Sequence, residues 1–290
     1  MTVFLQDVVS GLGFGGIYAL AALGLTIIFK TSNVVNFAFG AMATVVAMLV
    51  WTAHVSLGLP AALAWVLGIL GGGVLGAAAD LGLMRRVEGA PPLVSIVMTV
   101  GLLLAVEGLT GVIWGYSPKG ISNVISGRSF AIGPVSVDRN NLFIAALAVV
   151  VTYGLHLFYE RTRLGLAVRA VAEDGEIAPL MGVSRKWVLA LSWAVGVAVT
   201  GAAATLAAPS LGLQPNLMDN AAVYAFAAAV LGGLGSLLGA VVGGFAVGII
   251  SDVIAGYAST FQLALVFALI VVVLYLRPQG LFGRAAQVRQ

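Results

Sequence analysis

Apolar runs about as long as a membrane crossing recur along the whole chain, and few charges interrupt them. The last run extends without a break from Leu263 to Leu276, and Arg277 and Pro278 follow it directly. A bilayer core about 30 Å thick needs roughly 20 apolar residues per helix. Because the runs are continuous rather than alternating in polarity, they predict membrane-spanning helices and not a transmembrane β-barrel.

The composition supports lipid as the main environment of this protein. Hydrophobic residues make up 61% of the chain and charged residues only 9%, whereas a soluble domain carries roughly 25% charged residues. The absence of cysteine excludes disulfides and thiolate metal sites. The net charge of +3 is too small to indicate a nucleic-acid partner. We therefore expect an all-α, polytopic transmembrane helical bundle that forms a single domain over residues 1–290 in a lipid bilayer.

Eight apolar stretches stand out, and one of them is too long for a single crossing. They are Val8–Phe29, Val34–Ala53, Ala61–Met84, Leu93–Trp114, Leu142–Tyr159, Val188–Ala208, Ala221–Ile254 and Thr260–Leu276. The glycine-rich cluster Gly232–Ser236 interrupts the long stretch, which predicts a broken helix there. Two crossings would give about nine spans, and a re-entrant pair would give eight. Broken helices at membrane depth must be buried in protein or line a cavity, so we expect this cluster inside the bundle.

Basic residues divide unevenly between the two sets of segment ends. Those at one set are Lys30, Arg85, Arg86, Arg161, Arg163, Arg169, Arg185, Lys186, Arg277, Arg284 and Arg289. Those at the other set are Lys119, Arg128 and Arg139. An excess of Lys and Arg marks the cytoplasmic side. The pattern predicts a cytosolic tail at residues 277–290, with the N-terminus and the 116–141 loop outside, and an odd number of spans.

One loop, residues 160–187, is long and charged enough to dock a partner on the predicted cytosolic side. It contains Glu-x-Ala-x-x-x-Gly at Glu176, Ala178 and Gly182, which resembles the coupling loop of bacterial ABC permeases. In that family a short helix with this pattern sits in a groove of the ATP-binding subunit and transmits its closure. The alternative is an ordinary solvated loop. The residues expected to form the coupling site are Arg169, Glu173, Asp174, Glu176, Ala178 and Gly182.

The acidic and glycine positions of this loop fit the expected short helix. Glu173, Asp174 and Glu176 near its start would suit the helix dipole. Gly182 would suit its C-terminal end, where a left-handed backbone is common.

Further segments match the same family in order along nearly the whole chain. They are Ser10–Thr26, Asn33–Gly40, Gly89–Leu93, Ala227–Gly244 and the tail Arg277-Pro-Gln-Gly-Leu-Phe-Gly283. With them, the chain resembles the permease subunits of branched-chain amino acid ABC importers, and specifically the first of the paired permeases. Branched-chain amino acids are then the default substrate, with urea, short amides or another small organic solute left open.

The resemblance also implies partners and a location. It places the chain in a bacterial inner-membrane complex with a second homologous permease, two ATP-binding cassette subunits and an external solute-binding protein. ATP would be used by those partner subunits, and this chain would bind no cofactor itself. We expect transport rather than catalysis, because no Ser/His/Asp triad is apparent and His54 and His156 are isolated. A stand-alone channel or secondary transporter is the alternative, and a membrane-embedded enzyme is a third.

Five residues are candidates for the substrate route: Asn33, Asn36, Phe37, Phe39 and Glu107. The two amides can donate and accept hydrogen bonds and would be costly facing lipid. We expect them to break the helix and to offer uncharged contacts to a solute, while Phe37 or Phe39 narrows the route. The alternative is that both asparagines cap the second span. Glu107, an ionisable group within a span, is either functional or a hydrogen-bonded packing residue.

Overall fold

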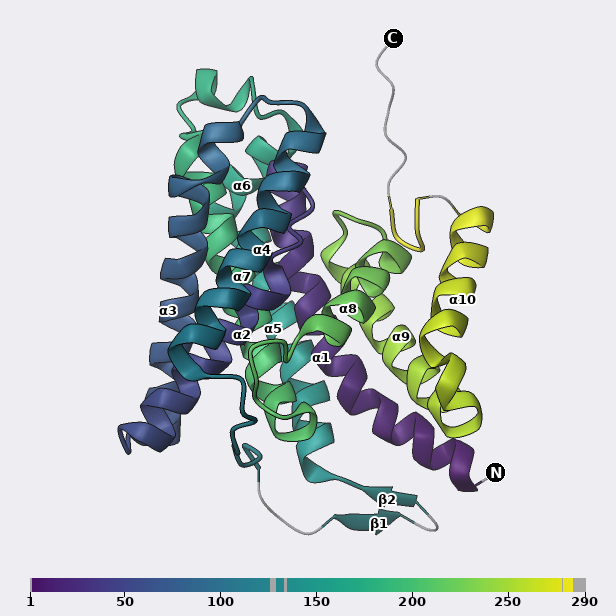
Figure 1. Cartoon of the computed structure of the whole chain (residues 1–290). Coiled ribbons are helices and arrows are strands. Elements are labelled where there is room, and N and C mark those ends of the chain that lie inside the picture. Colours follow the sequence, from purple (N-terminus) through teal and green to yellow (C-terminus); the bar gives the residue numbers. More distant parts are fainter. Residues whose placement is uncertain (1, 126–128, 133–134, 278, 284–290) are drawn as a thin grey trace.

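The computed structural model describes residues 2–125, 129–132, 135–277 and 279–283. Arg128, Arg284, Arg289 and the part of the predicted tail beyond Gly283 lie outside these residues. The described chain is a helical bundle with a small two-stranded hairpin at one end (Figure 1). Its α-helices are α1 (Thr2–Ser32), α2 (Phe39–Trp51), α3 (Ala61–Gly82), α4 (Pro92–Trp114), α5 (Arg139–Arg161), α6 (Arg163–Glu173), α7 (Arg185–Leu211), α8 (Asp219–Gly232), α9 (Leu237–Ala258) and α10 (Gln262–Leu276). The antiparallel strands are β1 (Phe130–Ile132) and β2 (Val135–Val137).

The predicted polytopic helical fold is confirmed. Within the described residues, seven helical stretches are long and apolar enough to cross a membrane. One of them, Leu237–Leu276, contains both α9 and α10. The long sequence stretch is interrupted at the glycine cluster, because α8 ends at Gly232 and α9 begins at Leu237. The 14 residues of α8 extend only about 21 Å at 1.5 Å per residue, so α8 is shorter than a bilayer core.

The second helix begins five residues later than the apolar pattern predicted. Asn33 has a left-handed backbone (φ 53°), which ends α1. Asn36 then accepts a hydrogen bond through Oδ1 from the backbone N–H of Ala38 at 2.9 Å. This side-chain turn competes with helix formation, so α2 starts only at Phe39. At its other end, α2 continues into a π-helical turn over Thr52–Ser56.

Helices α1 and α7 form the centre of the bundle, while α3, α4 and α5 are mostly exposed. Helix α1 packs closely along α9. A side chain at Gly248 would collide with the backbone of Gly15, and one at Gly244 would collide with Ala19. Glycine at these two positions therefore lets two helix backbones approach closely, as small residues do in membrane proteins.

The two ends of the bundle carry different elements. Helix α6 and the end of α10 lie at the upper end in Figure 1, and the N-terminus and the β1–β2 hairpin lie at the lower end. The C-terminal ends of α1, α5 and α10 lie on the α6 side of the bundle. They carry Lys30, Arg161 and Arg277, respectively. Lys119 lies in the segment between α4 and the hairpin.

Candidate functional site

The segment between α5 and α7 starts with a short amphipathic helix. Thr162 begins α6 by accepting the N–H of Gly165 through its hydroxyl at 2.9 Å. Gly165, Val168 and Val171 form the buried face of α6, whereas Arg169 and Glu173 are exposed. The spacing of three residues places the buried positions on one side of the helix. The charged side of α6 therefore faces away from the bundle.

A compact turn follows α6 and carries the rest of the predicted coupling site. The Oδ1 of Asp174 accepts the backbone N–H groups of Glu176 and Ile177, both at 3.0 Å. A single 3₁₀ turn covers Ala178–Met181, and Gly182 ends it with φ 82°. Glu173 is the last residue of α6 and does not start the expected short helix. The turn at Asp174 separates α6 from the 3₁₀ turn that follows.

The tip of this turn exposes large apolar side chains. Ala178 is only 4% exposed and anchors the turn on the bundle, while Leu180 is 83% exposed and Met181 is 80% exposed. The Glu-x-Ala-x-x-x-Gly pattern selects the polar and small positions of the loop, so the sequence interpretation missed these two residues. Large apolar side chains grouped on a fixed turn are typical of a surface that another protein covers.

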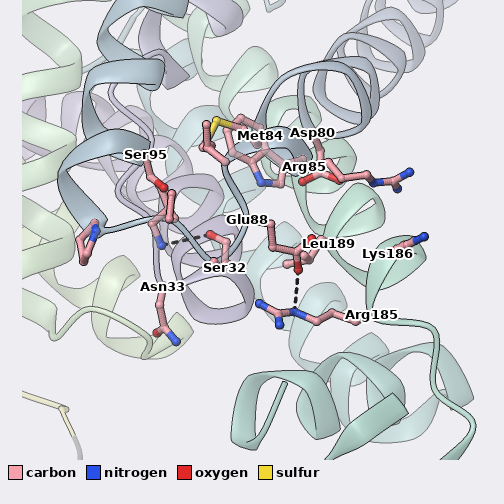
Figure 2. Close-up of a pocket in the computed structure, with 16 residues that line it drawn as sticks. Ser32, Asn33, Asp80, Met84, Arg85, Glu88, Ser95, Arg185, Lys186 and Leu189 are labelled. Carbon is pink, nitrogen blue, oxygen red and sulfur yellow. Dashed lines mark hydrogen bonds and ion pairs between the residues drawn. The ribbon is translucent and has the colours of Figure 1, made fainter. Parts of the chain in front are cut away.

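A cavity of about 190 Å³ lies beside this loop. Its walls come from the end of α1, the turn between α3 and α4, and the start of α7 (Figure 2). Asp80 lines it although that residue is only 4% exposed. Arg85, Glu88, Arg185 and Lys186 supply the other charges of the lining. The cavity thus joins elements that are far apart in the sequence at the basic end of the bundle.

An ion pair between Glu88 and Arg185 connects two of these walls. Arg185 Nε lies 3.0 Å from Glu88 Oε1 (Figure 2). Within the described chain, Nε makes no hydrogen bond of acceptable angle, so the contact is charge pairing without a directional hydrogen bond. The two side chains are 35% and 30% exposed, so water screens this pair in part.

The predicted route residues between α1 and α2 occupy different environments. Asn33 is exposed and lines the cavity. Asn36 is fully buried and closes the turn before α2 by accepting the Ala38 N–H, although its Nδ2 has no hydrogen-bond partner among the described residues. Phe39 is 4% exposed, whereas Phe37 is 39% exposed. The ring of Phe37 lies 6.3 Å from that of Phe226 on α8.

The remaining route candidate, Glu107, lies on α4. Its negative charge acts on the carboxyl group of Asp219, the first residue of α8. Asp219 and Phe226 are about two helical turns apart and so share one face of α8. Phe37 therefore contacts α8 through Phe226, and Glu107 acts on the same helix through the charge of Asp219, while Asn36 and Phe39 are enclosed within the bundle. The described residues contain no group of three or more His, Cys, Asp or Glu side chains that could hold a metal ion.

Comparisons with known proteins cover almost the whole chain. It is 29% identical to the high-affinity branched-chain amino acid transport system permease protein BraD of Pseudomonas aeruginosa, over 97% of this chain and 96% of that protein. It is 28% identical to the permease protein LivH of Escherichia coli K12, with the same coverage. A probable LivH of Methanocaldococcus jannaschii is also 28% identical, over 93% of this chain and 90% of that protein.

No solved structure gives a significant match. The family model described as branched-chain amino acid transport system / permease component matches residues 8–276. This match takes in the central helices, the loop after α5 and the α8–α9 break. The chain therefore belongs to the family of branched-chain amino acid transport system permease components.

Proposed function

We propose that this chain carries branched-chain amino acids across a bacterial inner membrane as one permease of an ATP-driven importer. The substrate assignment is supported by its relatives, which are named as high-affinity branched-chain amino acid permeases. The complex would contain a second homologous permease, two ATP-binding cassette subunits and an external solute-binding protein. ATP would bind to the cassette subunits, and this chain would bind no cofactor.

The observation that carries this proposal is the apolar tip at Leu180 and Met181. The hydrogen bonds of Asp174 and the left-handed Gly182 hold the tip from both sides. A pre-formed turn loses less conformational entropy when it binds than a flexible loop does. We infer that Leu180 and Met181 enter a groove of the cassette subunit, while Arg169, Glu173 and Glu176 contact its rim.

We further propose that the end of the bundle that carries α6 faces the cytosol. The basic residues at the ends of α1, α5 and α10 support this orientation. The N-terminus and the β1–β2 hairpin would then face outside, where the solute-binding protein docks.

The substrate route in this proposal runs along the face shared by α4, α8 and the α1–α2 break. Phe37, with 39% of its surface exposed, would narrow the route where it meets Phe226. Glu107 and Asp219 would line it with polar groups, and Asn33 would stand near its cytosolic end. Asn36 and Phe39 would hold the break in place from behind, since both are buried.

Reconstitution of the whole importer tests the proposal. The complex should accumulate leucine, isoleucine and valine in an ATP-dependent manner, and unlabelled urea should not compete. Leu180→Asp should leave the permease in the membrane but release the cassette subunits on purification. Leu57→Asp is the matched control, because Leu57 is also 68% exposed but lies beyond the other end of α2. Uptake by the permease alone without ATP, or normal uptake by Leu180→Asp, would contradict the assignment.

A further inference from the structure

We propose that Glu88 and Arg185 form a latch that passes movement of residues 174–184, the part of the 160–187 loop that is called the coupling loop from here on, to the turn between α3 and α4. The inference rests on the proposed function and adds a second connection inside the permease itself. Both residues act as positioning residues, since neither is placed on the α4–α8 face assigned to the solute.

Arg185 lies between the coupling loop and Glu88. It is the first residue of α7, three positions after Gly182. A side-chain carbon at Gly175 would lie 3.4 Å from both Nε and Cζ of Arg185, so the guanidinium group lies beside the loop at Gly175. The same Nε lies 3.0 Å from Oε1 of Glu88. A displacement of the loop therefore moves a group that is already in contact with the α3–α4 turn.

Glu88 is fixed to a tight turn that leads directly into α4. Within this turn the N–H of Arg86 donates to the carbonyl oxygen of Leu83 at 3.0 Å, and that of Ala90 donates to Val87 at 3.1 Å. Helix α4 begins at Pro92. Pro91 and Pro92, whose rings fix φ, join this short turn to the helix, so few free backbone torsions remain to absorb a pull on Glu88.

Helix α4 in turn contacts the break between α1 and α2. The hydroxyl of Thr99, two turns into α4, lies 3.4 Å from the carbonyl oxygen of Val35, although its nearer acceptor is the Ile96 carbonyl of its own helix at 2.9 Å. Val35 stands two residues before Phe37, the residue proposed to narrow the route. The contacts therefore run continuously from the coupling loop through Arg185, Glu88 and α4 to the α1–α2 break.

The ion pair has the strength expected of a contact that breaks and forms again in each transport cycle. The two side chains are 35% and 30% exposed, and a partly exposed pair contributes only modestly to stability. A deeply buried pair would instead strongly resist separation.

The test compares solute transported per ATP hydrolysed in the reconstituted whole importer. Glu88→Gln and Arg185→Gln should each lower this ratio roughly two- to fivefold, the factor that a partly exposed ion pair is worth. The double variant Glu88→Gln/Arg185→Gln should be no worse than either single variant, because both remove the same contact. Arg86→Gln is the matched control, since Arg86 is exposed in the same turn, and it should keep the wild-type ratio.

Two further measurements separate the latch from the docking of the cassette subunits. Each Gln variant should retain those subunits on purification and melt close to the wild-type temperature. Wild-type ratios in both single variants, or additive losses in the double variant, would overturn the latch while leaving the loop assignment intact. If Leu180→Asp also transported normally, the proposed function would fail as well.

Discussion

Leu281 donates its backbone N–H to the carbonyl oxygen of Leu231 at 2.9 Å, and Phe282 donates in the same way to Gly232 at 3.0 Å. The last carbonyl groups of a helix have no partners within the helix. The segment that follows α10 therefore folds back and satisfies the end of α8. The tail motif and the glycine cluster, which are distant in the sequence, form one structural unit that holds the α8–α9 break.

Replacing Gly280 by alanine should loosen this unit. Gly280 has φ 76°, and a side-chain carbon there would lie 2.6 Å from the backbone nitrogen of Gly233 and 2.8 Å from the carbonyl oxygen of Val230. The positive φ alone should cost about 1–3 kcal/mol of stability, and the collision should lower the melting temperature of the purified complex further. Gly58→Ala is the control, since Gly58 has φ 67° but open space around it. Equal shifts in both variants would show that backbone strain alone accounts for the effect.

A side chain at Gly248 should separate α1 from α9. The collision there is with the backbone of Gly15, which cannot rotate away as a side chain could. Gly248→Ala should therefore reduce the yield of folded permease in the membrane. Gly73→Ala on α3 should be neutral or slightly stabilising, because its nearest neighbour is 3.9 Å away and alanine favours a helix by about 1 kcal/mol over glycine. Similar yields of the two variants would mean that α1 and α9 are not closely packed.

Single cysteines at two exposed positions test the proposed orientation, because the natural chain contains none. Ser122 lies in the segment after α4, and Ser184 lies at the start of α7, at the other end of the bundle. In intact cells an impermeant thiol reagent should modify Ser122→Cys and spare Ser184→Cys. After cell lysis both should react. The reverse pattern in intact cells would place the α6 side of the bundle outside.

The two neighbouring route candidates Asn36 and Phe37 should respond differently to truncation. Asn36→Ala removes the hydrogen bond that its Oδ1 accepts from the Ala38 N–H, and loss of one such hydrogen bond costs about 1 kcal/mol of stability. Phe37→Ala removes a partly exposed ring that contacts Phe226, so the uptake of solute per ATP should change. Uptake at matched membrane levels and thermal melting separate the two effects. If Phe37→Ala altered only the melting temperature, the route would lie elsewhere.

The sequence alone determined where the membrane helices lie and which protein family the chain belongs to. A crossing needs a fixed length of apolar residues, so the stretches near Ala61–Gly82 and Pro92–Trp114 were predicted within a few residues. The break at Gly232 was also predicted. Each glycine is about 1 kcal/mol less favourable than alanine within a helix, so consecutive glycines interrupt a helix through their own local preference.

The tertiary structure decided which helices are central and which side chains meet across the bundle. In a membrane protein apolar residues cover both the lipid-facing and the buried surfaces, so the sequence did not separate the enclosed α1 and α7 from the exposed α3 and α4. The late start of α2, the contact of Leu281 with Leu231 and the pairing of Glu88 with Arg185 were likewise not predicted. Each depends on a single hydrogen bond or charge contact, and the last two form only once distant segments have packed together.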